Sequence, residues 1–567
     1  MLKCRCRLQF RWVVCVAANR HACFLASISI KMISSHTDLL QQRLDVLASG
    51  PSRERLVDGL RGIEKESLRV TPDGVIAITP HPRALGSALT HPSLTTDYSE
   101  ALIELITPAE RDVALTLERL DQLHREVYAA LGEEMLWNES MPGTLPVDDE
   151  IPIADYGSSN IGRLKTIYRR GLAYRYGRSM QCIAGIHYNY SLHEDIWLRL
   201  REHAQSAASL VDYQSERYLA QIRNFRRTSW LLMYLFGASP VLDKAFLRGR
   251  DSTLESFFNA TKRHRPYATS LRMSDLGYSN TTAQAALVVD YNSLDAYLNA
   301  LSKAVSEPYP AYEAIGTHRD GEWIQLSTNV LQIENEFYST IRPKRVTYSG
   351  ERPLCALASR GVQYIEVRCL DIDPFEPTGI ALDTARFMDA YLLVCALDDS
   401  AQLECDASRE ADANFDRVTM EGRKPGLELV RDGAAISMRD WAGEVFVKIE
   451  AAVRVLDEIR GDDVHARAVA AQRVKLDDPD LTPSARVLRE MRERGESFLD
   501  FARRQSKAHA AYFRARPLDT KAAEEAKRLV EKSLAEQAEL EGKDNSRSFD
   551  GFVAAYRAYR RCCINRA

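Results

Sequence analysis

The stretch that decides the fold is Arg61-Gly62-Ile63-Glu64-Lys65-Glu66-Ser67-Leu68-Arg69. Glu64 and Glu66 lie two residues apart between the apolar Ile63 and Leu68. In a β-strand, residues two apart point to the same face, so both carboxylates would share one face. Two like charges so close are unfavourable unless a positive charge lies between them, and Mg²⁺ prefers carboxylate oxygen. The stretch taken alone also fits a solvated edge strand.

A turn at Gly74 follows this stretch, and the mostly apolar residues 75–79 then return as a second strand. Glycine after Pro-Asp is typical of a tight turn. We therefore predict a hairpin over residues 61–80.

A second acidic stretch, residues 95–108, contains Asp97 and Glu104. Glu104 lies in the apolar run Leu102-Ile103-Glu104-Leu105-Ile106. A carboxylate in a buried strand is costly unless it is paired or bound to a metal. A helix with Glu100 and Glu104 on one solvated face fits the spacing equally well, so both interpretations stay open.

Two later segments alternate polar and apolar residues, as half-buried strands do. The segment 185–191 places His187 on its polar face, and the segment 364–371 places Glu366 and Arg368 on its polar face. A lone histidine is more often structural than a ligand, but neutral imidazole can bind a metal. We expect a third such strand over residues 331–339, with Gln332, Glu334, Glu336 and Tyr338 on one face.

Two segments are rich in basic side chains, residues 162–177 and 341–345. The first combines arginines with tyrosines and is interpreted either as a solvated helix with buried tyrosines or as a cationic wall over an anionic substrate. In the second, Lys344 and Arg345 either face solvent or contact phosphate.

Composition excludes several classes of protein. The chain has 567 residues, a formal net charge of −4 and a pI of about 6.4, which gives no global basis for binding nucleic acid or an anionic membrane. No run of 18 apolar residues occurs, so we predict no membrane-spanning helix. The eleven cysteines lack zinc-site spacing and are scattered, which indicates a reducing, cytoplasmic location.

We predict three regions along the chain. Residues 1–35 are interpreted as an extension outside the core, by preference a mis-called start with the true beginning at Met32 or a disordered segment. A weak signal peptide and an arginine-rich mitochondrial targeting sequence stay open as alternatives. Residues 36–440 would form the catalytic core. Residues 441–567 are rich in alanine and charge and would form helices that pack on or extend that core.

Many of these motifs together resemble the proteobacterial type of glutamate–cysteine ligase. The matching segments follow one another in order and are residues 62–70, 84–91, 95–108, 185–191, 267–278, 331–336, 341–345, 364–368 and 421–426. The resemblance runs from about residue 40 to 500. It implies an α+β fold similar to glutamine synthetase, in which a curved, mostly antiparallel sheet forms an active-site funnel with helices packed outside.

The resemblance also implies a reaction. ATP would phosphorylate the γ-carboxylate of L-glutamate, and the amine of L-cysteine would attack the acyl phosphate to give γ-glutamylcysteine, the first step of glutathione biosynthesis. Two or three Mg²⁺ ions would be required, with Mn²⁺ as a substitute and ATP as co-substrate. A monomer is expected, with no nucleic-acid or membrane partner.

Residue roles are carried over from the matching motifs. The metal ligands would be Glu64, Glu66, Asp97, Glu104, His187 and Glu366. The amino-acid substrates would contact Tyr98, Tyr168, Leu172, Gln181, Arg272, Tyr278, Tyr338 and Arg368. Arg368 and Glu66 are the expected catalytic residues, and Lys344 and Arg345 the expected nucleotide contacts. Tyr98 stands where some family members carry phenylalanine, which could change the polarity of the cysteine pocket.

Two rival functions stay open at this point. A related carboxylate–amine ligase with another amine would share the metal face and differ in the tyrosine-lined pocket. A non-catalytic regulator that binds ATP or an amino acid would have no need of the complete acidic set.

Overall fold

The computed structural model describes residues 39–249, 254–257, 259–277, 284, 287–348, 350–544 and 548–558. The predicted extension, residues 1–35, and the predicted substrate contact Tyr278 therefore lie outside the described residues. The description begins in a helix that runs to residue 48.

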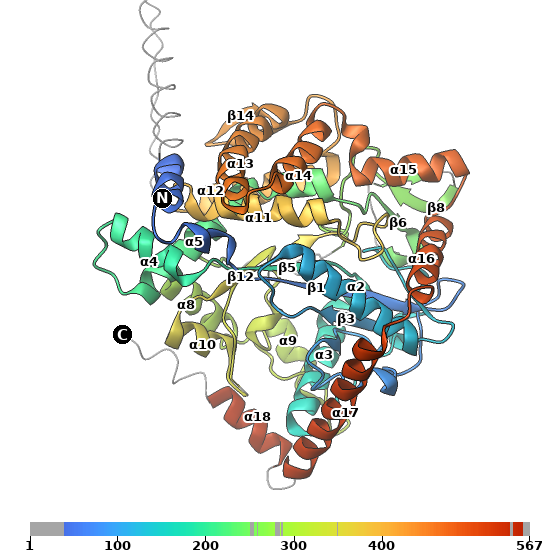
Figure 1. The fold of residues 1–567 in the computed structure, drawn as a ribbon. Coiled ribbons are helices and arrows are strands. Elements are labelled where there is room, and N and C mark those ends of the chain that lie inside the picture. Colours follow the sequence, from blue (N-terminus) through green and yellow to red (C-terminus); the bar gives the residue numbers. More distant parts are fainter. Residues whose placement is uncertain are drawn as a thin grey trace, which may run out of the picture.

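A seven-stranded sheet lies at the centre of the molecule (Figure 1). Its path is β11 (Ile341–Lys344), β12 (Tyr364–Leu370), β5 (Ile186–Tyr190), β1 (Arg61–Val70), β3 (Leu102–Ile106) and β2 (Leu94–Thr96), and β4 (Met135–Leu136) pairs with β1 off this path. Every ladder of the sheet is antiparallel. Strands distant in sequence thus become neighbours, with β12 beside β5 and β5 beside β1.

The register of β1 decides which side chains meet. Glu64 lies opposite His187 on β5, and Glu66 lies opposite Glu104 on β3. The strand interpretation of the segment around Glu104 is therefore correct, and the helix alternative is wrong. The predicted hairpin is confirmed only at its turn, where Ile76 forms an antiparallel bridge with Val70 and the Ala77 N–H donates to the carbonyl of Arg69 at 2.9 Å. Over the rest of β1 the prediction is wrong, because β5 and β3 pair with that part of the strand.

Helices surround the sheet. Figure 1 shows α11, α13 and α14 on one side of it and α3, α9, α10 and α18 toward the other end of the molecule. The helices up to residue 421 are α2 (Val113–Ala130), α3 (Asn160–Tyr176), α4 (Glu194–His203), α5 (Leu210–Thr228), α6 (Trp230–Phe236), α8 (Leu294–Ala304), α9 (Pro310–Ile315), α10 (Pro353–Arg360), α11 (Leu382–Leu397) and α12 (Cys405–Glu421).

Most of the remaining chain is helical. The helices are α13 (Met438–Arg460), α14 (Val464–Arg473), α15 (Pro483–Arg494), α16 (Phe498–Arg514), α17 (Thr520–Lys543) and α18 (Phe549–Ala558). Small sheets are formed by β6 (Val241–Asp243), β8 (Asn259–His264) and β7 (Glu255–Phe257), by β9 (His318–Arg319) and β10 (Glu322–Trp323), and by β13 (Glu428–Arg431) and β14 (Ala434–Ser437). The proposed division of the chain near residue 440 stays a prediction. Within the described residues, no helix combines the length and the apolar character that a membrane crossing needs.

The strand predicted over residues 331–339 is wrong. The structure has a short 3₁₀ helix there, Glu334–Glu336, followed by a loop. The reason is that the two acids serve different partners: Glu334 is paired with Arg352, and Glu336 is paired with Arg175. Each buried carboxylate is satisfied by its own guanidinium, and the backbone turns between them.

A buried ion pair joins β1 to α11. Arg61 Nε lies 2.8 Å from Asp389 Oδ1, and the Tyr188 hydroxyl donates to the same carboxylate at 2.7 Å. The side chains of Arg61 and Asp389 are only 5% and 6% exposed. The pair therefore fixes the start of the central strand against the helix layer.

Replacing Arg61 by methionine is expected to lower the free energy of unfolding by about 3–5 kcal/mol, because it leaves the Asp389 carboxylate buried without its partner. Urea-induced unfolding followed by tryptophan fluorescence measures this. Arg53→Met is the matched control, since its pair with Glu458 is 41% and 75% exposed and should contribute about 0.5 kcal/mol. Equal losses in the two variants would contradict the role given to the buried pair.

Candidate active site

Four adjacent strands bring carboxylates and one imidazole to one face of the sheet. Glu64 and Glu66 come from β1, with His187 from β5 beside them. The ring nitrogens of His187 lie 3.1 Å from Glu64 Oε2 and 3.6 Å from Glu66 Oε1. Glu366 on β12 follows at 3.9 Å from His187 Nδ1.

The ligand atoms fall into two groups that share His187. One group is Glu64, His187 and Glu366; the other is Glu66, Glu104 and His187. Within each group, one donor atom from each residue lies within 4.8 Å of the others. Five of the six predicted metal ligands thus meet. The sixth, Asp97, lines the same cavity at the end of β2.

Burial and mutual repulsion strain this acidic face. Burial raises the pKa of Glu104 well above its ordinary range, and the nearby Glu64, Asp97 and Glu66 raise it further. Burial also raises the pKa of Glu66. Oxygen donors held close together at this electrostatic disadvantage fit a hard divalent cation, which would relieve the repulsion.

Two cationic side chains, from β11 and β12, lie beside the acidic face at its Glu366 end. Lys344 Nζ lies 3.2 Å from Glu366 Oε1, and Arg368 Nη1 lies 3.2 Å from Glu366 Oε2. Burial alone would raise the pKa of Glu366, but Lys344 and Arg368 outweigh it and hold that pKa well below its usual range. The floor of the site therefore has an acidic side and a cationic side.

A cavity of about 460 Å³ lies over this floor. Besides the six acidic and imidazole groups, it is lined by the predicted contacts Tyr98, Tyr168, Leu172, Gln181, Tyr338, Lys344 and Arg368. Arg272 and Arg345 are not among its lining residues. Arg345 instead donates to the backbone carbonyl of Arg360.

Arg272 lies directly behind the pocket wall. Its Nη2 donates to the carbonyl of Arg368 at 3.1 Å, and its side chain is 1% exposed. A Cβ built on Gly185 would lie 1.9 Å from the same nitrogen, so only glycine at this position leaves room for the guanidinium. Arg272 thus supports the strand that carries Arg368.

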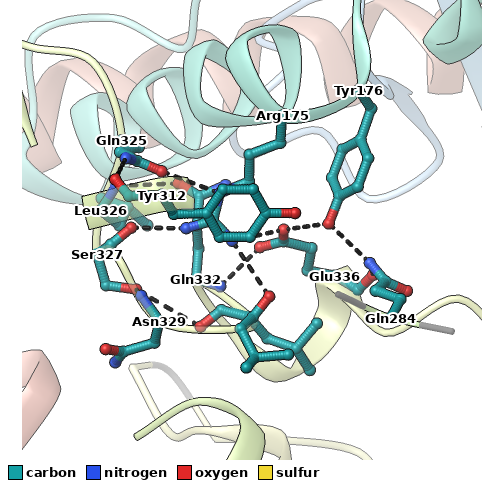
Figure 2. Close-up of polar contacts among 12 residues, drawn as sticks. Arg175, Tyr176, Gln284, Tyr312, Gln325, Leu326, Ser327, Asn329, Gln332 and Glu336 are labelled. Atoms are coloured by element: carbon teal, nitrogen blue, oxygen red, sulfur yellow. Dashed lines mark hydrogen bonds and ion pairs between the residues drawn. The ribbon is translucent and has the colours of Figure 1, made fainter. Parts of the chain in front are cut away.

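The tyrosine side of the pocket is held by a buried network that sequence analysis missed (Figure 2). Arg175 Nη1 lies 2.9 Å from Glu336 Oε1, and both side chains are fully buried. The Tyr176 hydroxyl donates to Glu336 at 2.7 Å and accepts from Gln284 Nε2 at 2.8 Å. Gln284 in turn accepts from the backbone N–H of Tyr338 at 3.2 Å, which fixes the backbone at this cavity-lining residue.

Helix α3 runs along the pocket and supplies several of its residues. Tyr168, Leu172 and Tyr176 are spaced four residues apart, so they share one face of the helix. That spacing was the available sequence signal for Tyr176. Lys165, one turn earlier, also lines the cavity; burial lowers its pKa to about 8, and its ammonium lies 5.0 Å from the ring centre of Tyr156.

The fold and the pocket together define the class of this protein. It is an enzyme whose active site lies on a face of the central sheet, where acidic and cationic side chains line one cavity. Comparison with known proteins narrows the class. The family model for glutamate–cysteine ligase matches residues 44–418.

Relatives of high identity cover nearly the whole chain. A glutamate–cysteine ligase of Pseudomonas paraeruginosa is 59% identical over 522 residues, which is 92% of this chain and 98% of that protein. One of a Janthinobacterium species is 58% identical over 520 residues, with the same coverage. The chain therefore belongs to the glutamate–cysteine ligase family, which confirms the resemblance.

Solved structures agree. The glutamate–cysteine ligase of Francisella tularensis in complex with AMP has a TM-score of 0.84 and 38% identity, covering 89% of this chain and 99% of that one. A bifunctional glutathione synthetase of Pasteurella multocida has a TM-score of 0.65 and 26% identity, covering 83% of this chain and 54% of that one. The first likeness confirms the predicted α+β fold.

Replacing Glu104 by glutamine is expected to raise the thermal midpoint of the metal-free protein by ~2 °C at about pH 8. The folded-state pKa of Glu104 is raised, so the wild type loses stability as the pH rises from about 4.5 through that pKa, and the amide avoids this loss. The difference should vanish toward about pH 4, where both side chains are neutral. Differential scanning fluorimetry measures it.

The exposed Glu118→Gln is the matched control and should leave the midpoint unchanged. Added Mg²⁺ should stabilise the wild type more than the Glu104 variant. A lower midpoint for metal-free Glu104→Gln would show that this carboxylate is stabilised in the folded protein.

Proposed function

We propose that this pocket joins the γ-carboxylate of L-glutamate to the amine of L-cysteine through γ-glutamyl phosphate, with conversion of ATP to ADP and release of inorganic phosphate when the amine displaces it. The product is γ-glutamylcysteine, which enters glutathione biosynthesis. One observation carries the proposal: the two ligand groups around His187 and the paired cations Lys344 and Arg368 line one cavity. Membership in the glutamate–cysteine ligase family supports the same reaction.

The carboxylates and His187 are proposed to hold two or three Mg²⁺ ions, or Mn²⁺ in their place. The first group would comprise Glu64, His187 and Glu366, and the second Glu66, Glu104 and His187 with Asp97 nearby. Such ions, when bound, neutralise phosphate oxygens and polarise the transferring phosphoryl group. Glu66, whose side chain lines the cavity and belongs to the second group, is also proposed as a catalytic residue.

Arg368 is proposed to stabilise the negative charge that develops on the transferring phosphoryl group. Its guanidinium is directed by Glu366, and its backbone N–H donates to the carbonyl of Thr340 at 2.8 Å. A donor fixed before the reaction needs little reorganisation, which is why such groups contribute strongly to rate. Lys344, which is also paired with Glu366, is proposed to contact the nucleotide phosphates.

The tyrosine side is proposed to bind the two amino acids. Tyr98, Tyr168, Leu172, Gln181 and Tyr338 line it. The Tyr98 hydroxyl is buried and has no hydrogen-bond partner among the described residues, so it can bond a polar group of a substrate. A monomeric state and a cytoplasmic location stay predictions.

ADP release by the purified protein tests the function. With Mg–ATP and glutamate, addition of cysteine should increase the release strongly, and mass spectrometry should detect γ-glutamylcysteine. If another amine increases ADP release and cysteine does not, that amine and not cysteine is the second substrate. Absence of release with any amine would contradict catalysis.

Arg368→Lys is expected to lower kcat by about 10²-fold, because lysine keeps the charge but loses the fixed planar donors. Steady-state kinetics measure the change. Arg409→Lys is the control, since the side chain of Arg409 is 77% exposed and outside this cavity. Equal kcat values for the wild type and Arg368→Lys would remove Arg368 from the catalytic step.

A further inference from the structure

The C-terminal helices reach the active site by a defined route. Helix α17 is anchored to residues 87–90, where Ser87 N donates to Ser533 Oγ at 3.0 Å. At its C-terminal end, Asp544 accepts from the backbone N–H of Asn160 at 2.5 Å, at the first turn of α3. Figure 1 shows α17 running to α18 near α3. The position of α18 is thus tied to the N-terminal end of α3.

Helix α18 is packed firmly on that end of α3. Phe549 and Val553 are 5% and 2% exposed and form one apolar cluster with Leu164, Ile167 and Ile333. The Trp323 indole also donates to Asp550 at 2.9 Å. These contacts belong to one face of α18, and they fix its orientation.

One residue of α18, Tyr556, lines the active-site cavity. The guanidinium of Arg352 lies 5.0 Å from the centre of its ring. Arg352 is itself 2% exposed and paired with Glu334, so it is a fixed support for the ring. Its Nε and Nη1 have no hydrogen-bond partner in the described part of the chain, which leaves two buried donors beside the ring.

Helix α3 gives the order of the groups along the cavity. Its lining residues begin with Ile161 and Leu164 near its N-terminus, continue with Lys165, and end with Leu172 and Tyr176. At 1.5 Å per residue, Ile161 and Leu172 are about 16 Å apart along the axis. The cavity thus has an apolar end next to α18, with Lys165 directly after Leu164 at the border of that end, and the tyrosine side at its far end.

We propose that α18 forms a wall of the nucleoside end of the cavity, where the ring of Tyr556 packs against the purine base of ATP. The inference rests on the proposed function, which places the phosphates at Lys344 and Arg368 and the amino acids on the tyrosine side. Ile161, Leu164, Ile333 and Pro353 line the same end and offer a base the apolar contacts it prefers. Lys165, the residue after Leu164, lies between this end and the tyrosine side.

The test is nucleotide binding and kinetics with Tyr556 variants of the full chain. Tyr556→Ala should raise the Kd for ADP, measured by calorimetry, and the KM for ATP by about tenfold, since aromatic stacking on a base is lost. The KM values for glutamate and cysteine should change by less than about twofold, because those substrates lie beyond Lys165. Tyr556→Phe should keep wild-type values for all three substrates.

Matched controls separate this role from a folding defect. Ala554→Ser alters an exposed position of the same helix and should leave ADP binding unchanged. Tyr556→Leu keeps apolar bulk without the ring, and it should bind ADP as weakly as Tyr556→Ala while keeping the wild-type thermal midpoint. An unchanged Kd for ADP in both the Ala and Leu variants would overturn the inference, as would equal increases in all three KM values.

A separate measurement, cysteine-dependent ADP release by the wild-type chain, tests the proposed function. A wild-type chain that binds ADP but shows no cysteine-dependent ADP release would contradict the ligase reaction. The ADP binding of the Tyr556 variants would still decide the role of α18 in that case.

Discussion

The repulsion among buried carboxylates is the constraint on which the rest of this structure depends. Glu64, Glu66, Glu104 and Glu366 come from three strands and would separate if the backbone allowed it. The antiparallel ladders do not allow it, because β1 is held between β3 and β5 through fixed hydrogen-bond registers. The sheet therefore keeps the acids at short range, and their repulsion remains available to attract a cation.

The cations that compensate for this concentration of charge come from other strands of the sheet and not from β1 itself. On the pocket side, Lys344 and Arg368 pair with Glu366 and leave the other acids facing the cavity. On the opposite side, Lys65 points away from the pocket, and burial without a carboxylate partner lowers its pKa to about 7. Its ammonium contacts His124 at 2.9 Å and Asn138 at 3.1 Å instead. The positive charge at the acidic face thus comes mainly from β11 and β12, which are distant in sequence.

Sequence analysis predicted the parts of the site that follow from local alternation. The period of two placed Glu64 with Glu66 and set His187, Glu366 and Arg368 on polar faces, and family motifs joined these faces into one site. It failed where partners distant in sequence determine the backbone conformation, as at residues 331–339. There Glu334 pairs with Arg352 and Glu336 pairs with Arg175, and the segment does not form a strand. No local pattern indicated that Tyr556, almost 400 residues after Tyr168, lies at the same cavity. Arg345 shows the opposite error, since a basic cluster was expected to act together and its members point to different partners.

Helix α3 lines the cavity from the end beside α18 to the tyrosine side, and this has a consequence for how such an enzyme can diversify. Changes at Leu172 or Tyr176 would reshape the far end of the cavity while Ile161 and Leu164, more than two turns away, stay in place. A descendant could therefore acquire a different amine substrate and inherit the rest of the cavity intact. A one-residue insertion within the helix would have the opposite effect: it would rotate everything downstream by about 100° and break the alignment of the two ends in a single event.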